Sequence, residues 1–439
     1  MFDEVSDSRL LTMWKKYLTE HEHKNKLLQK FRLCGSRQLR IPGEIPSTVI
    51  MSNGEKSRMI GIQTCHSSWA CPRCSARVMA QYGTRIACAI EALAKQYNQY
   101  AVMITFTLPH TNNMTCWEAF QILRDTWRQF ARRGSTKIKR KHTCKDGTEK
   151  IYNISTNAYN AMRSELGIKH CVRVYEATYG KDNGWHPHIH ALFWIPKENF
   201  DKITDYEERL IDAWWSAAKY NAFKFYGNES YVNELYAEYK KHPITGHKSV
   251  FISREKNGKP RIQASSHYLV GWTGDFELTN VKAKSAHYEG HYSPNQLLQM
   301  AYEQPEQRNY WLKIYTDYAK ATVGQKRVNF SPTGINDIVR AWKKTNEYIE
   351  LLKKKATDKA QEKWKLVIWF TEKQWLNISL LDTEHYLISE ILALAKLSNG
   401  KQLITDMLIK FGIDVSGNGR HPNQDEIERR NFENQILVA

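Results

Sequence analysis

The chain has 439 residues and a formal net charge of +18 at pH 7. This length exceeds what one hydrophobic core supports, so we expect two or three domains, and a hydrophobic content of 41% is enough to fill them. The charge favours a polyanionic partner. Aromatic residues, 12% of the chain, add rings on which unpaired bases stack, although many of them must fill the core.

The sequence argues against a membrane protein and against a secreted one. It contains no run of about 18 apolar residues. The N-terminal segment MFDEVSDSRLLTMWKKY begins acidic and lacks a continuous apolar stretch, unlike a secretory signal. Eight cysteines over this length do not form the dense pattern of a disulfide scaffold. We therefore expect a cytoplasmic protein.

The first region, residues 1–98, combines an opening helix, a cysteine cluster and a helix from about 75 to 97. In the segment TCHSSWACPRC, the Cys71-Pro-Arg-Cys74 step presents two thiolates to one tetrahedral ion, and Cys65 precedes it closely. Cys34, in FRLCGSRQL, is the expected fourth ligand, and His66 is the alternative. The spacing predicts a structural Zn²⁺ site in this N-terminal segment.

The second region, residues 99–300, alternates strand and helix patterns. The expected elements are a strand at 101–110, a helix at 117–133 with period-3.6 apolar residues, a basic segment at 132–150, two strands at 171–180 and 185–195 joined by a turn at 181–184, and a helix at 203–220. The third region, residues 301–439, is expected to be helix-rich.

A metal site is expected on the strand GWHPHIHALFW. Residues two apart on a strand share a face, so His188 and His190 can reach one divalent ion. If the turn centres near 182–183, Glu176 lies opposite these histidines or one residue away and completes the site. His186 shares the face and competes as third ligand. Imidazole and carboxylate ligands with open positions suit Mg²⁺ or Mn²⁺.

Four segments occur in the order and spacing of a known family: TCHSSWACPRCSARV, MITFTLPH, RVYEATYGKDNGWHPHIHALFW and SSHYLVGWTGDFELTNVKAKSAHYEGHYSPNQLL. Over residues 30–300 the chain resembles bacterial rolling-circle replication initiators of the HUH endonuclease superfamily, which are typical of small plasmids. The resemblance implies an α+β fold, an antiparallel sheet with helices on one face, with an HUH endonuclease domain at 99–300. It also implies metal ligands at His188 and His190 and a nucleophilic tyrosine at Tyr268.

The sequence departs from the family around that tyrosine. Family members commonly carry a lysine three residues after it, where this chain has Gly271, and Lys282 or Lys284 are candidate replacements. Some relatives carry a glutamate four residues before it, where this chain has Ala264, which leaves the termination step open. Tyr288 is the rival nucleophile.

The expected activity is site-specific nicking and joining of single-stranded or hairpin origin DNA in the bacterial cytoplasm, through a 5′-phosphotyrosine intermediate. A host polymerase would extend the free 3′ end, and a host helicase is a candidate partner. No Walker-type GxxxxGK[ST] motif occurs, so no fused helicase or ATPase is expected. Two alternatives stay open. One is a transposase of the same superfamily, and the other is a zinc-containing DNA-binding regulator without nuclease activity.

Overall fold

The structure is a computed structural model in which the described chain forms two compact units. The first unit comprises residues 1–81, 295–323 and 346–439, and the second comprises 82–294 and 324–345. The division of the chain at residues 98 and 300 that the sequence favours stays a prediction. The described residues are 6–42, 44–132, 136–143, 149–156, 158–237, 249–263, 290–332, 334–350, 364–415 and 425–427.

The fold is mixed, with antiparallel sheets and helices. The elements of the second unit are the end of α3 (Pro72–Tyr97), β3 (Gln99–Thr107), α4 (Cys116–Arg132), β4 (Thr136–Thr143), β5 (Glu149–Thr156), α5 (Ala158–Glu165), β6 (Cys171–Gly180), β7 (Gly184–Pro196), the 3-10 helix η2 (Lys197–Tyr206), α6 (Glu207–Tyr226), α7 (Glu229–Ala237), β8 (Val250–Ile252), β9 (His291–Tyr292), β10 (Val328–Phe330) and α11 (Ile335–Trp342).

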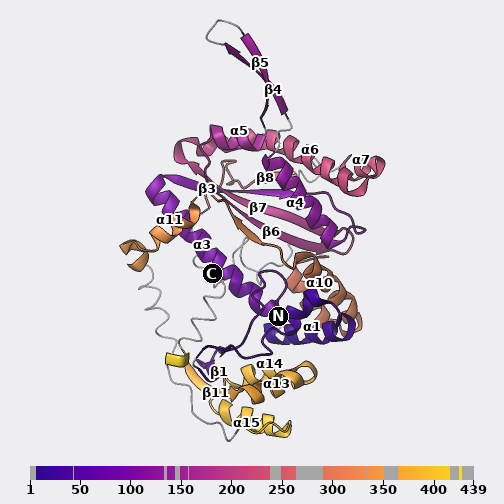
Figure 1. Cartoon of the computed structure of the whole chain (residues 1–439), viewed down its shortest axis with the longest axis vertical. Helices are drawn as coiled ribbons and strands as arrows, with labels where there is room; N and C mark the ends of the chain where they lie inside the picture. Colours follow the sequence, from indigo (N-terminus) through magenta and orange to yellow (C-terminus); the bar gives the residue numbers. More distant parts are fainter. Residues whose placement is uncertain are drawn as a thin grey trace. The chain divides into compact units, whose positions relative to one another are not determined.

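A six-stranded sheet forms the centre of the second unit. Its order is β10-β6-β7-β3-β8, with β9 paired to β6, and every pair is antiparallel. Figure 1 shows β6, β7 and β3 side by side in this sheet. The strand expected at 101–110 and the helix expected at 117–133 are confirmed as β3 and α4.

The expected hairpin of β6 and β7 is confirmed, with Gly180 paired to Gly184 and Glu176 directly opposite His188. Gly184 has φ +71°, in the left-handed region where a side chain is strained. A Cβ at this position would also lie 2.6 Å from the carbonyl oxygen of Thr111. Glycine is therefore required at the turn that sets the register of both strands.

An aromatic core covers one face of this sheet. The Phe106 ring of β3 lies 5.3 Å from Trp127 of α4 and 5.0 Å from Trp214 of α6, measured between ring centroids. Tyr159 of α5 contacts Phe193 of β7 on the same side. Helices α4, α5 and α6 therefore pack on the face that carries Phe106 and Phe193, because residues two apart on a strand share a face.

The first unit contains a smaller, three-stranded sheet in the order β11-β1-β2. Its core includes Phe370 of the sheet and Trp375, Ile391 and Ile404 of three helices. Strands β10 and β11 show that the region after residue 300 contributes to both sheets. The elements of this unit are α1 (Asp7–His21), η1 (Lys26–Leu28), α2 (Gln29–Arg32), β1 (Ser47–Ser52), β2 (Ser57–Ile60), the start of α3, α9 (Pro294–Glu303), η3 (Pro305–Gln307), α10 (Arg308–Thr322), β11 (Lys365–Thr371), α13 (Glu372–His385), α14 (Leu387–Leu394) and α15 (Gly400–Lys410).

Among the described residues, none of the helices has the length and apolar character that crossing a membrane requires.

Replacing Trp214 with alanine should destabilise the second unit by about 3–5 kcal/mol, because the indole fills the aromatic core and a cavity would remain. The side chain is fully buried, and its Nε1 donates a hydrogen bond of 2.7 Å to the carbonyl oxygen of Thr107. Urea unfolding followed by circular dichroism measures the change. Trp117→Ala is the matched control, since this side chain is 53% exposed, and should cost less than about 1 kcal/mol. Equal losses in the two variants would contradict the packing described.

Candidate metal centres

Three side chains converge on the face of the six-stranded sheet opposite the aromatic core. Glu176 comes from β6, and His188 and His190 come from β7. Their candidate ligand atoms all lie within 4.8 Å of one another. The Nε2 atoms of His188 and His190 lie 3.5 Å and 3.4 Å from Oε2 of Glu176. The structure thus brings together the residues expected from the sequence, as a group that could hold a metal ion.

Hydrogen bonds behind the two rings leave the Nε2 atoms available to a metal. The Nδ1 of His190 lies 2.9 Å from the hydroxyl oxygen of Thr105 on β3. The Nδ1 of His188 lies 3.3 Å from the carbonyl oxygen of His186 and donates to it. Such contacts fix the tautomer and the orientation of a metal-binding imidazole. The donor set therefore fits a divalent cation that accepts nitrogen and oxygen ligands.

Arg327 supplies a positive charge next to the carboxylate. Its guanidinium lies 3.8 Å from Oε1 of Glu176, the oxygen that does not face the histidines, and both side chains are almost fully buried. A buried carboxylate is costly unless charges or hydrogen-bond donors compensate it. Arg327 immediately precedes β10, which pairs with β6, and this long-range pairing explains its position. The sequence contains no local signal that would have identified it.

His186, the rival third ligand, lies outside this group of three. Its ring stacks on His110, with centroids 4.4 Å apart and an angle of 6° between the planes. Burial lowers the pKa of His110, and its Nδ1 donates to the carbonyl oxygen of Leu108. No expectation from the sequence placed His110, the last residue of MITFTLPH, beside the histidine strand. Its position after a strand that pairs with the histidine strand was the available signal.

The candidate nucleophiles Tyr268 and Tyr288 lie outside the described residues, as do Ala264, Gly271, Lys282 and Lys284. Their roles stay predictions.

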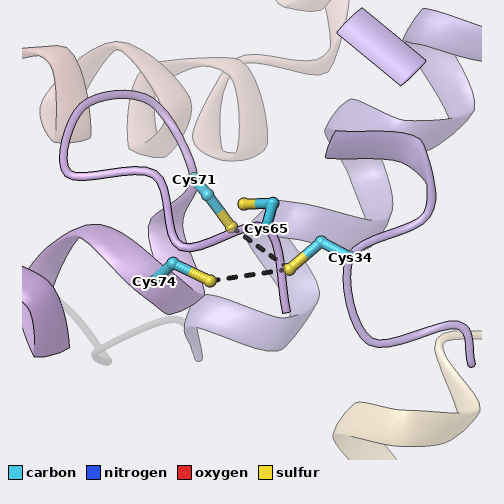
Figure 2. Close-up of side chains that lie close together, drawn as sticks. All are labelled: Cys34, Cys65, Cys71 and Cys74. Carbon is cyan, nitrogen blue, oxygen red and sulfur yellow. Dashed lines mark hydrogen bonds between the residues drawn. The ribbon is translucent and has the colours of Figure 1, made fainter. Parts of the chain in front are cut away.

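The second group that could hold a metal consists of Cys34, Cys65, Cys71 and Cys74, all free of disulfide bonds. Figure 2 shows these thiols pointing toward one another from separate segments. Cys34 Sγ lies 3.6 Å from the Sγ atoms of Cys71 and Cys74. A tetrahedral ion with metal–sulfur bonds of about 2.3 Å requires sulfur–sulfur distances of about 3.8 Å. The four thiols therefore match the donor set and size of a tetrahedral thiolate site.

Local backbone geometry explains how two of these thiols are presented. Pro72 occupies the first position of α3, where a missing N–H is tolerated. The N–H groups of Cys74 and Ser75 donate to the carbonyl oxygen of Cys71, which closes the first turn and places both thiols together. The positive end of a helix also favours thiolates. His66, the alternative ligand, is not part of the group of four.

Cys34 reaches the cluster from a different segment, the loop after α2. Gly35 has φ +76°, and a Cβ there would collide with the guanidinium of Arg73. The N–H of Gly35 donates to the carbonyl oxygen of Gln63, which holds this loop beside the segment of Cys65. In the sequence, the glycine that follows Cys34 is the feature that indicated a metal ligand at this position.

Two basic side chains, Arg73 and Lys15, lie near the thiols. Hydrogen bonds from Cys65, Cys71 and Cys74 lower the pKa of Cys34, and the charge of Arg73 lowers it as well. Burial raises the pKa of Cys71. Lys15 is buried nearby and donates to the hydroxyl of Ser36. The charge of Arg73 favours thiolate, but four adjacent thiolates would repel one another, so a bound cation is the natural complement of the cluster.

Two curated proteins resemble part of the chain at the sequence level. An alignment of 147 positions, which covers 31% of the chain and 30% of the relative, is 27% identical to "Protein rep" of Streptomyces lividans. A second alignment of 149 positions, which covers 30% of the chain and 30% of the relative, is 28% identical to "Neomycin resistance protein" of Streptomyces cyanogenus. The chain thus spans less than a third of the length of these relatives. No family model matches, and no solved structure gives a significant match.

His190→Ala should weaken Mn²⁺ binding by at least about 100-fold, because removing a direct ligand should cost no less than the loss of an outer-shell contact. Thr105→Val, which removes only the hydroxyl behind the ring, should weaken it by about 10- to 100-fold. Titration followed by electron paramagnetic resonance measures both affinities. His186→Ala is the control and should bind as the parent does. A loss in that variant equal to the loss in His190→Ala would make His186 a ligand.

Cys71→Ser or Cys74→Ser should abolish stoichiometric zinc in the purified protein, since hydroxyls are poor substitutes for thiolates at a tetrahedral ion. Elemental analysis of metal per chain measures the loss. Cys88→Ser is the matched control, because this thiol is equally buried in α3 but lies outside the group of four. If the parent protein is expressed in medium that contains zinc and elemental analysis finds no zinc in the purified chain, the site is contradicted.

Proposed function

We propose that the chain is a rolling-circle replication initiator of the HUH endonuclease superfamily, which nicks and rejoins single-stranded origin DNA. The observation that carries this proposal is the convergence of Glu176, His188 and His190 on one face of an antiparallel sheet. The net charge of +18 supports a nucleic-acid substrate. The distant likeness to the "Protein rep" of Streptomyces lividans supports the same class.

In this proposal the residues of the sheet hold and orient a divalent ion. A bound Mg²⁺ or Mn²⁺ would polarise the scissile phosphate and offset the charge that builds on it. Glu176, His188 and His190 would hold this ion, and Thr105 keeps the His190 ring in place. Arg327 acts as a positioning residue, because its guanidinium lies against the carboxylate oxygen that faces away from the histidines.

The proposed nucleophile is Tyr268. Its phenolic oxygen forms a bond to phosphorus while the bond from phosphorus to the 3′ oxygen breaks. The phenol gives up its proton, and the 3′ oxygen takes one up. One phosphodiester replaces another, so later rejoining requires no ATP. The free 3′-hydroxyl would prime a host polymerase, and a host helicase would separate the strands, since the chain has no Walker-type motif.

The cysteine cluster has a separate, structural role in this proposal. Four thiolates fill the coordination of a tetrahedral Zn²⁺ and leave no position for water or phosphate. The cluster joins the loop after α2, the segment of Cys65 and the start of α3, so bound zinc would stabilise the first unit directly. Zinc removal is therefore expected to unfold this region rather than to stop chemistry.

Tyr268→Phe should abolish the covalent adduct while leaving DNA binding intact, because only the attacking hydroxyl is lost and affinity comes mainly from phosphate contacts. The experiment incubates the protein with Mn²⁺ and a single-stranded oligonucleotide labelled on the 3′ side of the cleavage site. Denaturing electrophoresis then detects labelled protein. Tyr288→Phe is the control and should form the adduct at the parent's rate.

Peptide mapping of the trapped adduct provides the opposing outcome. A nucleotide attached to Tyr288 would reassign the nucleophile within the same mechanism. A parent protein that binds DNA but never forms an adduct, on DNA from its own element and with either metal, would favour the zinc-containing DNA-binding regulator instead.

A further inference from the structure

Arg73 lies between the two cysteines of the Cys71–Cys74 step, and its guanidinium is only partly satisfied by hydrogen bonds. Its Nη2 donates a bond of 3.3 Å to the hydroxyl of Ser8 on α1. Nε and Nη1 are buried, and neither has a hydrogen-bond acceptor among the described residues. A buried N–H group without an acceptor is costly, above all when it carries charge. Two donors at this position therefore remain available to a further acceptor.

The guanidinium of Arg73 lies against the segment that carries Cys34. A Cβ on Gly35, the next residue, would come within 1.8 Å of Nη1 and 3.1 Å of Cζ. Hydrogen bonds from the other three thiols lower the pKa of Cys34, and the charge of Arg73 lowers it as well. The glycine thus leaves the space through which this cation approaches the Cys34 thiol.

The filled cysteine site would carry negative charge inside the protein. Four thiolates around a divalent ion leave two negative charges, and three of the cysteines, Cys34, Cys71 and Cys74, are buried. Buried anions are stable only where cations or hydrogen-bond donors compensate them. Arginine suits this task because its guanidinium stays protonated and offers several N–H groups in a fixed plane.

Lys15 of α1 supplies only part of this compensation. Its ammonium is buried and donates a bond of 3.1 Å to the hydroxyl of Ser36. Burial lowers the pKa of Lys15, and the charge of Arg73 lowers it further. Cys34 and Asp382 act in the opposite direction. One ammonium is thus shared between a buried carboxylate and the thiols, which leaves a role for Arg73.

We propose that Arg73 is a positioning residue of the cysteine site, whose available guanidinium donors bind the Cys34 thiolate when the four sulfurs hold a divalent ion. The inference rests on the structural zinc site of the proposed function. Charge and hydrogen bonds from Arg73 stabilise the four-thiolate complex, so they raise the affinity for zinc. The same guanidinium ties α1 to the site through Ser8.

The test compares Arg73→Gln with Arg73→Lys in the full chain loaded with zinc. Glutamine removes the charge and should weaken zinc binding by about 10- to 100-fold, as the loss of an outer-shell partner does. Lysine keeps the charge but not the planar array of donors, so its affinity should lie between those of the parent and the glutamine variant. Competition with a chromophoric chelator measures the affinities. Circular dichroism checks the fold, which glutamine should preserve because it favours helices.

Arg85→Gln is the matched control. Arg85 lies further along α3, in the second unit, and donates to the side chain of Asn336. Its guanidinium lies 4.3 Å from the centroid of the Phe330 ring. The same substitution there should leave zinc affinity unchanged, because the lost charge lies away from the thiols.

A second readout separates charge from packing. The cysteine site should also accept iron, since a tetrahedral set of four thiolates suits either metal. With Fe²⁺ the complex carries one more negative charge than with Fe³⁺, so a nearby cation favours the reduced state and raises the reduction potential. Voltammetry of the iron-loaded protein should give a lower potential for Arg73→Gln than for the parent, with Arg73→Lys close to the parent. A residue that only packs would not produce this order.

The outcomes separate this role from the rest of the proposed function. A zinc affinity and a potential in Arg73→Gln equal to those of the parent would overturn the role of Arg73, as would equal values for the glutamine and lysine variants. A parent that binds no zinc overturns the metal site and this role together. A parent that never forms a DNA adduct, but whose zinc affinity falls in Arg73→Gln as stated, removes the nuclease and leaves the role of Arg73 in place.

Discussion

The register of the β6–β7 hairpin is the constraint on which the candidate catalytic site depends. Gly180 pairs with Gly184 across a turn that only glycine can make, and this pairing places Glu176 opposite His188. A slip of one residue would move the carboxylate to the aromatic face, because side chains alternate along a strand. One glycine conformation therefore decides whether three ligands meet or are separated by the thickness of the sheet.

The same alternation builds the core and the site from one set of strands. On β3, Phe106 enters the aromatic core with Trp127 and Trp214, while Thr105 faces the other way and supports His190. Burial of the aromatic groups stabilises the sheet by several kcal/mol and holds the polar side in place. The buried Glu176 carboxylate costs free energy in that setting, and the guanidinium of Arg327 compensates it in part. A divalent cation would complete the compensation, so binding is coupled to the rigidity of the sheet.

Sequence patterns were sufficient for features that depend on near neighbours. The two-residue spacing of His188 and His190, the turn before them and the Cys71–Cys74 step each predicted local geometry that the structure bears out. Arg327 could not be found in this way, because it reaches Glu176 through the pairing of β10 with β6, about 150 residues apart in the chain. The pairing of β1 with β11 could not be predicted from the sequence for the same reason. Tyr268 and the HUH fold itself rest on resemblance and stay predictions.

The chemistry of the two ligand sets assigns them different tasks. The four thiols match a closed tetrahedron, which binds a metal tightly and excludes any substrate. Glu176, His188 and His190 supply only three ligand groups, so an ion held there keeps positions for water or a phosphate oxygen. Each set also lies within a single unit, the thiols in the first and the histidine site in the second. A chelator that strips the first centre should therefore affect folding, whereas exchange of the metal at the second should affect rate, and the two effects can be measured independently on the same protein.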